Sequence, residues 1–313
     1  MTTPITTRFD AIRNEIKKVI VGQDTLIEQA LIGFLAGGHL ILEGVPGLAK
    51  TLFARAFAAS LALEFRRIQF TPDLMPSDLI GTNVFQPDKQ QFRFLPGPVF
   101  ADVLLADEIN RTPPKTQSAL LEAMEERQVT IDGTTHSLPP HFFVIATQNP
   151  IEYEGTFPLP EAQIDRFLMK IKISYPTADE ELQLLKNGPS TRPLNEIVSS
   201  VANPEHLIEA RLSVNAVRVE DKVYDYLLKL ITASRQLPQL ALGASPRAAQ
   251  GWLQAAKVRA ALRERDFVTP DDLKALAAPV LRHRLVLKPE TEIEGVTVEQ
   301  IINQLLASVE IPR

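Results

Sequence analysis

Short apolar runs alternate with amphipathic segments over the first 187 residues of the chain. Runs of apolar or β-branched residues predict five strands, at 39–43, 64–70, 102–106, 142–147 and 168–173. Apolar residues at helical spacing predict helices at 24–33, 50–60, 113–126 and 179–186. Strands that alternate with helices are typical of a parallel sheet covered by helices on both faces. We therefore expect an α/β fold, an αβα domain with a parallel five-stranded sheet, over residues 1–187.

The pattern changes after the Pro- and Gly-containing stretch at 187–193. Strand signals almost vanish, and long helical patterns follow at 220–236, 246–265 and 270–281. Thr269 and Pro270, followed by two acidic residues, form a good helix start with Thr269 as the N-cap. These features predict an all-α second domain over residues 188–313.

Two insertions interrupt the regular alternation in the first domain. The first, at about 71–98, contains two short strand patterns around a Pro87-Asp88 turn. The second, at about 128–138, is an alternating run folded at Asp132-Gly133, which is a strong hairpin signal. Hairpins that protrude from an α/β core usually make a contact, and the alternative is a surface decoration without a task.

Composition excludes several classes of chemistry. The chain has 313 residues, 45% hydrophobic and 23% charged, with a formal net charge of −5. Because there is no cysteine, disulfides, thiolate metal sites and a cysteine nucleophile are excluded, and the five histidines show no ligand spacing. No apolar run approaches the roughly 20 residues that span a bilayer, and the N-terminus lacks the apolar core of a signal peptide. We expect a cytoplasmic protein without membrane insertion, and the net charge gives no overall attraction to nucleic acid.

A phosphate-binding loop follows the first predicted strand. Residues 44–51 read Gly-Val-Pro-Gly-Leu-Ala-Lys-Thr and lie at a strand-to-helix turn, where backbone N–H groups and the helix dipole attract an anion. Lys50 would reach the terminal phosphates and the Thr51 hydroxyl would ligate magnesium. Ala49 departs from the general pattern, which has glycine there, and a positive φ at this alanine would mean local strain. The loop predicts nucleotide binding by Gly44, Val45, Pro46, Gly47, Leu48, Ala49, Lys50 and Thr51.

Two carboxylates follow the buried strand at 102–106. Asp107 and Glu108 come at its carboxyl end, where ligands bind in open α/β sheets. Asp107 would hold magnesium, and Glu108 would act as the general base on the attacking water. The alternative is a pair of acids that opens a loop. The position after the phosphate loop and a buried strand favours the functional interpretation.

Three further polar residues complete the candidate site. Asn149 follows the next strand, where its amide could contact the terminal phosphate and the attacking water, although it is also good turn chemistry before proline. Arg166 precedes the last strand, badly placed for its own phosphate loop and well placed for a neighbouring subunit's. Arg247 starts a helix of the second domain and would reach the γ-phosphate across the domain boundary. The alternative for both arginines is a solvated surface position. The clusters at 263–265 and 282–284 are expected to be solvated helix faces.

These segments, in this order, resemble the AAA+ ATPases and, within them, the MoxR family. The resemblance includes the alanine before Lys50 in the phosphate loop and the segment Leu-Ala-Asp-Glu-Ile-Asn-Arg at 105–111. The other similar segments are residues 21–23, 73–81, 97–100, 146–150, 154–161 and 243–247. The resemblance covers nearly the whole chain and is weaker in the second domain.

The resemblance implies a P-loop ATPase with a helical lid, assembled into a ring that is expected to be a hexamer. It places Val21 and Gly22 near adenine and implies ATP and Mg²⁺ as ligands. It makes Asn149 the first sensor, Arg166 the arginine finger given to a neighbour, and Arg247 the second sensor. It also implies a chaperone-like role in maturing client proteins or inserting metal, with a separate von Willebrand factor A domain protein as partner.

Two other functions remain open from the sequence. The first is a nucleic-acid-dependent or chelatase-like motor, which should carry basic or aromatic residues at the hairpin tips. The turns at 87–91 and 132–135 are mostly polar and near neutral, so nucleic acid is not the expected partner. The second is a non-catalytic assembly subunit, which the apparently complete set of Lys50, Asp107, Glu108 and Arg166 argues against.

Overall fold

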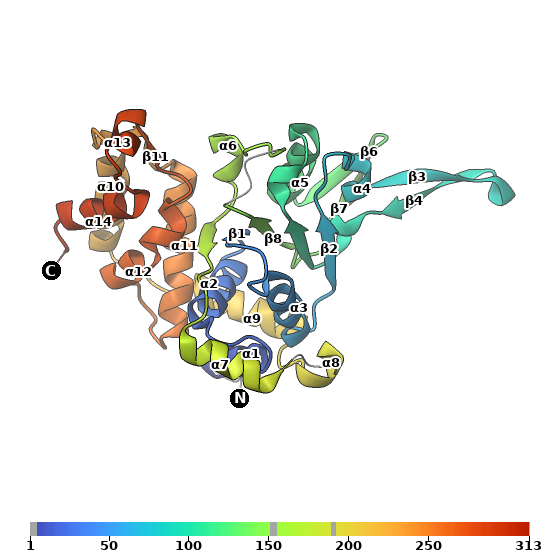
Figure 1. The fold of residues 1–313 in the computed structure, drawn as a ribbon, viewed down its shortest axis with the longest axis horizontal. Coiled ribbons are helices and arrows are strands. Elements are labelled where there is room, and N and C mark those ends of the chain that lie inside the picture. Colours follow the sequence, from blue (N-terminus) through green and yellow to red (C-terminus); the bar gives the residue numbers. More distant parts are fainter. Residues whose placement is uncertain (1–4, 151–154, 189–191, 313) are drawn as a thin grey trace.

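A parallel sheet forms the centre of the first half of the chain. The computed structural model describes residues 5–150, 155–188 and 192–312, and its sheet has the strand order β2-β5-β8-β1-β9 (Figure 1). Leu40 pairs with Ile145 on one side and with Met169 on the other. The strands are β1 (Leu40–Glu43), β2 (Phe65–Gln69), β5 (Val103–Asp107), β8 (Phe143–Gln148) and β9 (Met169–Lys172).

Side chains that alternate along the strands enter two separate buried clusters. Leu40 and Leu42 of β1 belong to a cluster with the helices that cover one face, whereas Ile41 belongs to the cluster on the other face. This explains the continuous apolar runs, because a strand with helices on both faces has no solvent side. The helices on the first face are α1 (Ile5–Lys17), α2 (Asp24–Leu35) and α3 (Lys50–Ser60), and those on the second are α4 (Pro76–Ile80) and α5 (Pro114–Glu126).

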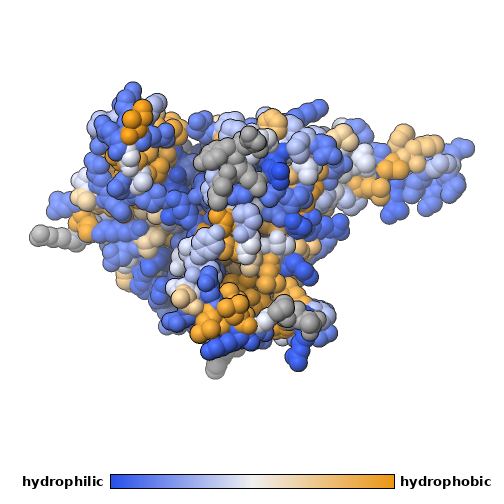
Figure 2. All heavy atoms as spheres, in the orientation of Figure 1, coloured by the Kyte–Doolittle hydropathy of each residue, from blue (hydrophilic) through white to orange (hydrophobic). Residues whose placement is uncertain are grey.

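Both predicted hairpins are present, and they differ in exposure. The first extends far from the body of the molecule (Figure 1), with a 3-10 turn at its tip. Phe85 and Phe92 pair across it, 49% and 72% exposed, and Figure 2 shows apolar surface there among polar residues. The second hairpin lies closer to the core, with Val129 and Ile131 buried. The strands are β3 (Gly81–Gln86), β4 (Gln91–Pro96), β6 (Gln128–Ile131) and β7 (Thr134–Ser137).

The second half of the chain is helical with one small addition. A two-stranded antiparallel ribbon, β10 (Leu240–Leu242) and β11 (Val286–Leu287), pairs Leu240 with Leu287. These strands are too short for a periodic sequence signal, so the all-α prediction was wrong at this point. The remaining helices are α6 (Glu161–Ile164), α7 (Ala178–Asn187), α8 (Leu194–Ile197), α9 (Pro204–Asn215), α10 (Asp221–Gln236), α11 (Pro246–Leu262), α12 (Pro270–Leu281), α13 (Pro289–Ile293) and α14 (Val298–Ser308).

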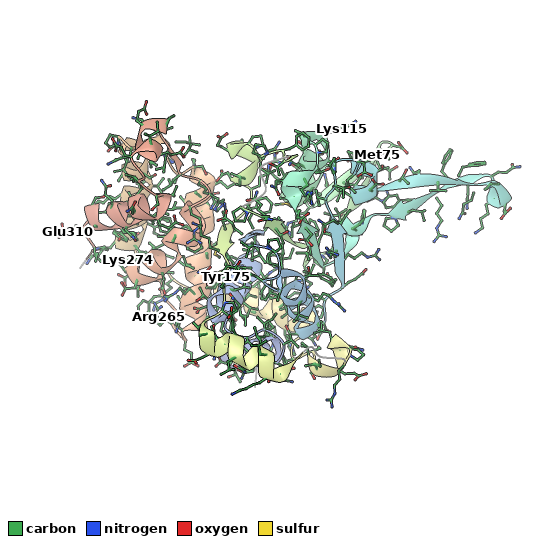
Figure 3. The ribbon with its side chains drawn as sticks, viewed as in Figure 1. Met75, Lys115, Tyr175, Arg265, Lys274 and Glu310 are labelled. Carbon is green, nitrogen blue, oxygen red and sulfur yellow. The ribbon has the colours of Figure 1, made fainter. Side chains whose placement is uncertain are left out.

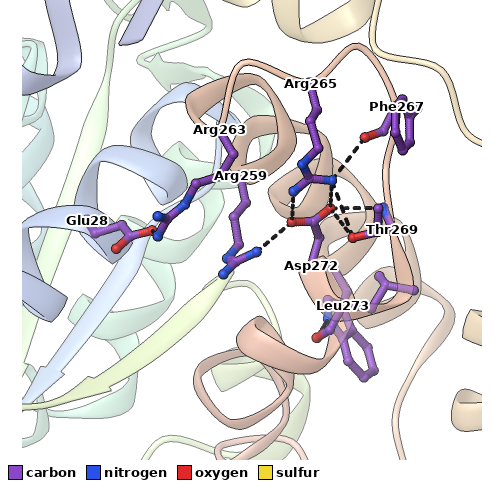
Figure 4. A network of polar contacts seen from close by, with 9 residues as sticks. Glu28, Arg259, Arg263, Arg265, Phe267, Thr269, Asp272 and Leu273 are labelled. Carbon is purple, nitrogen blue, oxygen red and sulfur yellow. Dashed lines mark hydrogen bonds and ion pairs between the residues drawn. The ribbon is translucent and has the colours of Figure 1, made fainter. Parts of the chain in front are cut away.

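In the predicted clusters at 263–265 and 282–284, Arg265, Arg282 and Arg284 are buried or half-buried, whereas Arg263 is 53% exposed. Asp272, with a fully buried side chain, accepts hydrogen bonds from Arg259 at 2.6 Å and from Arg265 at 2.6 and 2.7 Å (Figure 4). Burial opposes the charge on Asp272, but these bonds and those from Thr269 hold its pKa below the usual value. The prediction of solvated faces was wrong for Arg265, Arg282 and Arg284, because their carboxylate partners have no local sequence signal. It holds for Arg263.

The predicted αβα architecture and helical lid are confirmed, with strand ends shifted by one or two residues. The sequence interpretation missed α1, although Ile5, Phe9, Ile12 and Ile16 recur on one helical face. The boundary near residue 187 stays a prediction, and the linker at 187–193 and the motif at 154–161 lie partly outside the described residues. In the part of the chain that the structure describes, no helix combines the length and apolarity needed to cross a bilayer.

Candidate functional site

The phosphate loop connects the end of β1 to the start of α3. The Gly44 N–H donates to the Gln148 carbonyl at 3.3 Å, which ties the loop to the tip of β8. Gly47 has a φ of 89°, which glycine adopts without strain. Because α3 begins at Lys50, the free N–H groups of its first turn point toward the loop, as anion binding requires.

Ala49 immediately precedes α3 in a left-handed conformation, with φ 54° and ψ 24°. A residue with a Cβ in this region costs about 1–2 kcal/mol. The site therefore stores local strain at the one position where the loop departs from the general pattern. Such strained positions cluster at functional sites.

Lys50 and Thr51 lie in the first turn of α3. The Lys50 ammonium donates to the carbonyl of Gly44, and also to that of Val45 at 3.4 Å, so it lies over the loop. A phosphate held by the loop would be within the reach of this cation.

Asp107 ends β5 and is almost fully buried, with both carboxylate oxygens hydrogen bonded. Thr147 at the end of β8 donates its hydroxyl to Oδ1 at 2.6 Å. Arg67 of β2 donates to Oδ2 through Nε at 3.0 Å and Nη2 at 2.8 Å. The Asp107 carboxylate and the Thr51 hydroxyl are hard oxygen donors, the type that magnesium prefers, so this donor set fits that ion.

Glu108 has a φ of 58°, a second left-handed residue in the site. Its N–H donates to the Thr147 hydroxyl at 2.8 Å, and its Oε2 accepts from Gln69 at 2.6 Å and from Arg111 at 3.1 Å. Asn149, two residues beyond Thr147, is 7% exposed. The structure therefore brings the two acids and Asn149 to the carboxyl ends of adjacent strands, as predicted.

Sequence reasoning missed Arg67, Gln69 and Thr147. Gln69 is the last residue of β2 and Thr147 is the last but one of β8, and these two strands flank β5. Polar residues at the ends of adjacent parallel strands meet at one edge of the sheet, but the sequence does not say which strands are adjacent.

A pocket of about 360 Å³ lies beside the phosphate loop. The predicted Val21 lines it, whereas Gly22 is not among the lining residues. Gly22 has a φ of 74°, and an added Cβ there would lie 2.3 Å from Cδ of Glu180. Its size suits a nucleoside. The sequence did not indicate Tyr175, labelled in Figure 3, which lines the pocket from the segment after β9. The other lining residues are Val19, Ile20, Gln23, Pro46, Gly47, Leu48, Ala49, Pro176, Glu181 and Leu184.

Arg166 and Arg247 lie together in a different place. Arg166 pairs through Nε with Oε2 of Glu125 at 2.8 Å, and Arg247 pairs with Oε1 of the same carboxylate. Glu125 belongs to the last turn of α5. The Nε2 of His39, just before β1, contacts the Met124 carbonyl at 3.3 Å. The two arginines therefore lie at the end of the sheet where the strands begin, which we call the amino edge. Lys50 lies at the opposite end, where the strands finish, which we call the carboxyl edge.

The amino edge contains buried neutral histidines. Burial and the nearby Arg127 lower the pKa of His39 to about 3. Burial and the adjacent Arg284 hold the pKa of His283 well below its usual value, and its Nε2 contacts the Phe167 carbonyl at 2.9 Å. Among the described residues, no group of three or more acidic or histidine side chains could hold a metal ion.

Comparison with known proteins agrees with this geometry. Residues 39–169 match the ATPase family associated with various cellular activities (AAA), and residues 232–305 match the AAA lid domain. A crystal structure of a provisionally named ATPase from Cytophaga hutchinsonii superposes with a TM-score of 0.92 at 44% identity, covering 98% of this chain and 96% of that one.

Two curated relatives are similar over most of their length. Uncharacterized protein YeaC of Bacillus subtilis is 46% identical, covering 95% of this chain and 92% of YeaC. Chaperone MoxR1 of Mycobacterium tuberculosis is also 46% identical, covering 96% of this chain and 81% of MoxR1. From the phosphate loop to the helical lid, this chain is a member of the MoxR family of AAA+ ATPases.

Proposed function

We propose that the protein hydrolyses ATP to ADP and phosphate in a magnesium-dependent reaction, at sites shared between the subunits of a hexameric ring. Lys50 and Thr51 would bind the phosphates and the metal, and Asp107 would be the second metal ligand. When bound, magnesium supplies positive charge to the β- and γ-phosphate oxygens. Val21 and Gly22 would border the adenine.

One observation supports the proposal that the site is shared between subunits. The groups that a phosphoryl transfer needs are at opposite edges of one sheet. Lys50, Asp107, Glu108 and Asn149 belong to the carboxyl edge, whereas Arg166 and Arg247 pair with Glu125 at the amino edge. A guanidinium that neutralises charge on the transferred phosphoryl group must contact it. Both arginines would therefore act on the site of a neighbouring subunit. For Arg247, this replaces the sequence-based expectation that it reaches the γ-phosphate bound by its own chain.

Glu108 would take a proton from the attacking water, and Asn149 would orient that water. The left-handed backbone of Glu108 directs its carboxylate beside the end of β2, where Gln69 donates to it. A carboxylate held in this way is pre-oriented for proton transfer.

Mixing two inactive variants tests the shared site. Lys50→Ala and Arg166→Ala should each abolish ATP hydrolysis. A mixture should recover part of the activity, because a mixed ring contains interfaces in which both groups are intact. Absence of recovery in verified mixed rings would contradict the shared site.

The work performed by the ring is proposed to be the remodelling or maturation of client proteins, including metal insertion or complex assembly. The relative MoxR1 is named a chaperone. The exposed Phe85 and Phe92 of the first hairpin offer apolar contact to a protein segment. A separate von Willebrand factor A domain protein is the partner that the family resemblance suggests. Proteins retained by a ring trapped with ATP by Glu108→Gln would identify the client.

Residues of the same hairpin support a second candidate function, a nucleic-acid-dependent motor. Lys89 and Arg93 accompany the exposed Phe85 and Phe92, and aromatic and basic residues together bind single strands. Stimulation of ATP hydrolysis by single-stranded DNA at low salt, without stimulation by protein clients, would favour this candidate.

A further inference from the structure

Glu125 is the common partner of the two arginines at the amino edge of the sheet. Its two carboxylate oxygens are divided between them, Oε2 with Nε of Arg166 at 2.8 Å and Oε1 with Nη2 of Arg247. The three side chains are between 30% and 45% exposed, so a docked neighbour can reach them. They come from three separate segments: the last turn of α5, the loop before β9 and the first turn of α11.

Two of these segments, the loop before β9 and the start of α11, are fixed to each other by the residue before Arg166. Asp165 accepts from the Ser245 hydroxyl at 2.8 Å, and Ser245 is the N-cap of the helix that carries Arg247. The other Asp165 oxygen accepts from Nε of Arg284 at 2.6 Å, and the Arg284 side chain is 3% exposed.

Arg284 extends this connection along the loop. It donates to the carbonyls of Asp165 at 3.1 Å, Phe167 at 2.6 Å and Leu168 at 2.8 Å. Since these bonds set where the Cα atoms of Arg166 and Arg247 lie, the directions of the two long side chains are what remains to be decided. An arginine side chain samples many rotamers unless a partner orients it.

We propose that Glu125 is a positioning residue that orients Arg166 and Arg247 as a pair toward the phosphate of a neighbouring subunit. The contact with Arg166 uses its Nε–H, so the four N–H groups on its two Nη nitrogens are not used in this ion pair. Glu125 acts through the arginines and has no contact of its own with the nucleotide. The proposal rests on the shared site proposed above.

Steady-state kinetics of Glu125→Ala and Glu125→Gln test the positioning role. Misdirected arginines lower kcat by about tenfold in Glu125→Ala, since small misplacements of transition-state contacts are costly, while KM for ATP stays within about twofold. Glu125→Gln keeps the shape and one acceptor oxygen, so a smaller loss of kcat is expected. Glu126→Ala, in the adjacent exposed position of the same helix, is the matched control and should retain the parent kcat.

Mixed rings separate this role from a loss of folding or of the subunit's own site. A Glu125→Ala subunit keeps its own phosphate loop, so mixing it with Lys50→Ala should restore activity as Arg166→Ala does. Mixing it with Arg166→Ala should restore none, because both variants are defective at the same edge.

Each outcome has a distinct meaning. If Arg166→Ala complements Lys50→Ala but Glu125→Ala does not, Glu125 is not a positioning residue and the shared site stands. If Arg166→Ala itself fails to complement, the shared site is contradicted. An increase of kcat in Glu125→Ala would overturn positioning, because it would mean that the carboxylate restrains the arginines.

Discussion

The two edges of the central sheet are built in different ways. At the carboxyl edge, the phosphate loop and the acids follow directly from the strands that present them, so chain neighbours supply most of the groups. At the amino edge, Glu125, Asp165, Arg166, Arg247 and Arg284 come from segments that are up to 159 positions apart along the chain. The second edge exists only because α12 packs against β9 and Arg247 of α11 pairs with Glu125 of α5.

The two edges suit different tasks: the carboxyl edge suits nucleotide binding within one chain, and the amino edge suits contact with a neighbouring subunit. The carboxyl edge has what one chain needs to hold a nucleotide, including a pocket beside the loop and two acids with bonded oxygens. The amino edge presents two cations to the outside of the subunit. We therefore expect substitutions at the first edge to act within a subunit, and substitutions at the second edge to act on its neighbour or on stability.

Removal of the proposed base should have the largest effect. Glu108→Gln should lower kcat by about 10²–10⁴, the range that general base catalysis contributes, while ATP binding measured by fluorescence titration is retained. Glu122→Gln, an exposed residue of α5, serves as the control. Full turnover by Glu108→Gln would exclude Glu108 as the base.

Breaking the buried Asp165–Arg284 ion pair at the amino edge should have the largest effect on stability. Asp165→Ala leaves the buried Arg284 guanidinium without its carboxylate and should lower the free energy of unfolding by about 3 kcal/mol. Asp266→Ala removes a pair with Arg218 in which both side chains are 73% exposed, and should cost less than about 1 kcal/mol. Denaturant titration measures both free energies of unfolding. Equal losses for the two variants would contradict a stabilising role of the buried Asp165–Arg284 pair.

Acid should weaken the amino edge through its buried histidines. His39, with its pKa lowered to about 3, and His283 remain neutral in the folded state, whereas unfolded histidine takes up a proton near pH 6.5. Their contribution is fully present above pH 6.5 and is lost as the pH falls. His39 should remove about 2 kcal/mol from the free energy of unfolding between pH 7.5 and 5, and His283 should add a loss in the same direction.

Denaturant titrations at several pH values measure this loss, and His39→Gln should reduce its slope. A pH-independent free energy of unfolding over the same range would contradict the neutral buried histidines.

Relief of strain in the phosphate loop should have the smallest effect. Ala49→Gly removes about 1–2 kcal/mol of left-handed strain and adds about 0.5–1 kcal/mol of backbone entropy cost, so a net gain of about 0.5–1 kcal/mol is expected. Ala62→Gly, at φ 55° outside the loop, should give a similar gain in thermal unfolding without changing nucleotide binding. A loss of stability in Ala49→Gly alone would mean that the alanine makes contacts which outweigh the strain.

The sequence predicted the elements with the strongest local signals. All five strands of the sheet and both hairpins were expected where they occur, because their apolar runs and turn residues are contiguous. The short strands β10 and β11 and the helix α1 were missed, the first two for lack of length. The order of the strands in the sheet is not encoded locally, and Gln69 and Thr147 entered the site only through that order.

The burial of Arg265 and Arg284 could not be predicted from the sequence. Arg265 and Arg284 resemble solvated residues in the sequence, yet one binds the buried Asp272 and the other is itself buried against Asp165. An arginine is buried or exposed according to the carboxylate that faces it, and that partner can lie anywhere along the chain.

The sequence by itself determined the nucleotide-binding edge of this MoxR-family protein, since a strand, a loop and a helix in succession place a phosphate site wherever they fold. Only the tertiary structure decided that Arg166 and Arg247 meet at Glu125, away from the phosphate loop of their own chain. The physical reason is that backbone direction is local, whereas the pairing of charges depends on which distant surfaces are packed together.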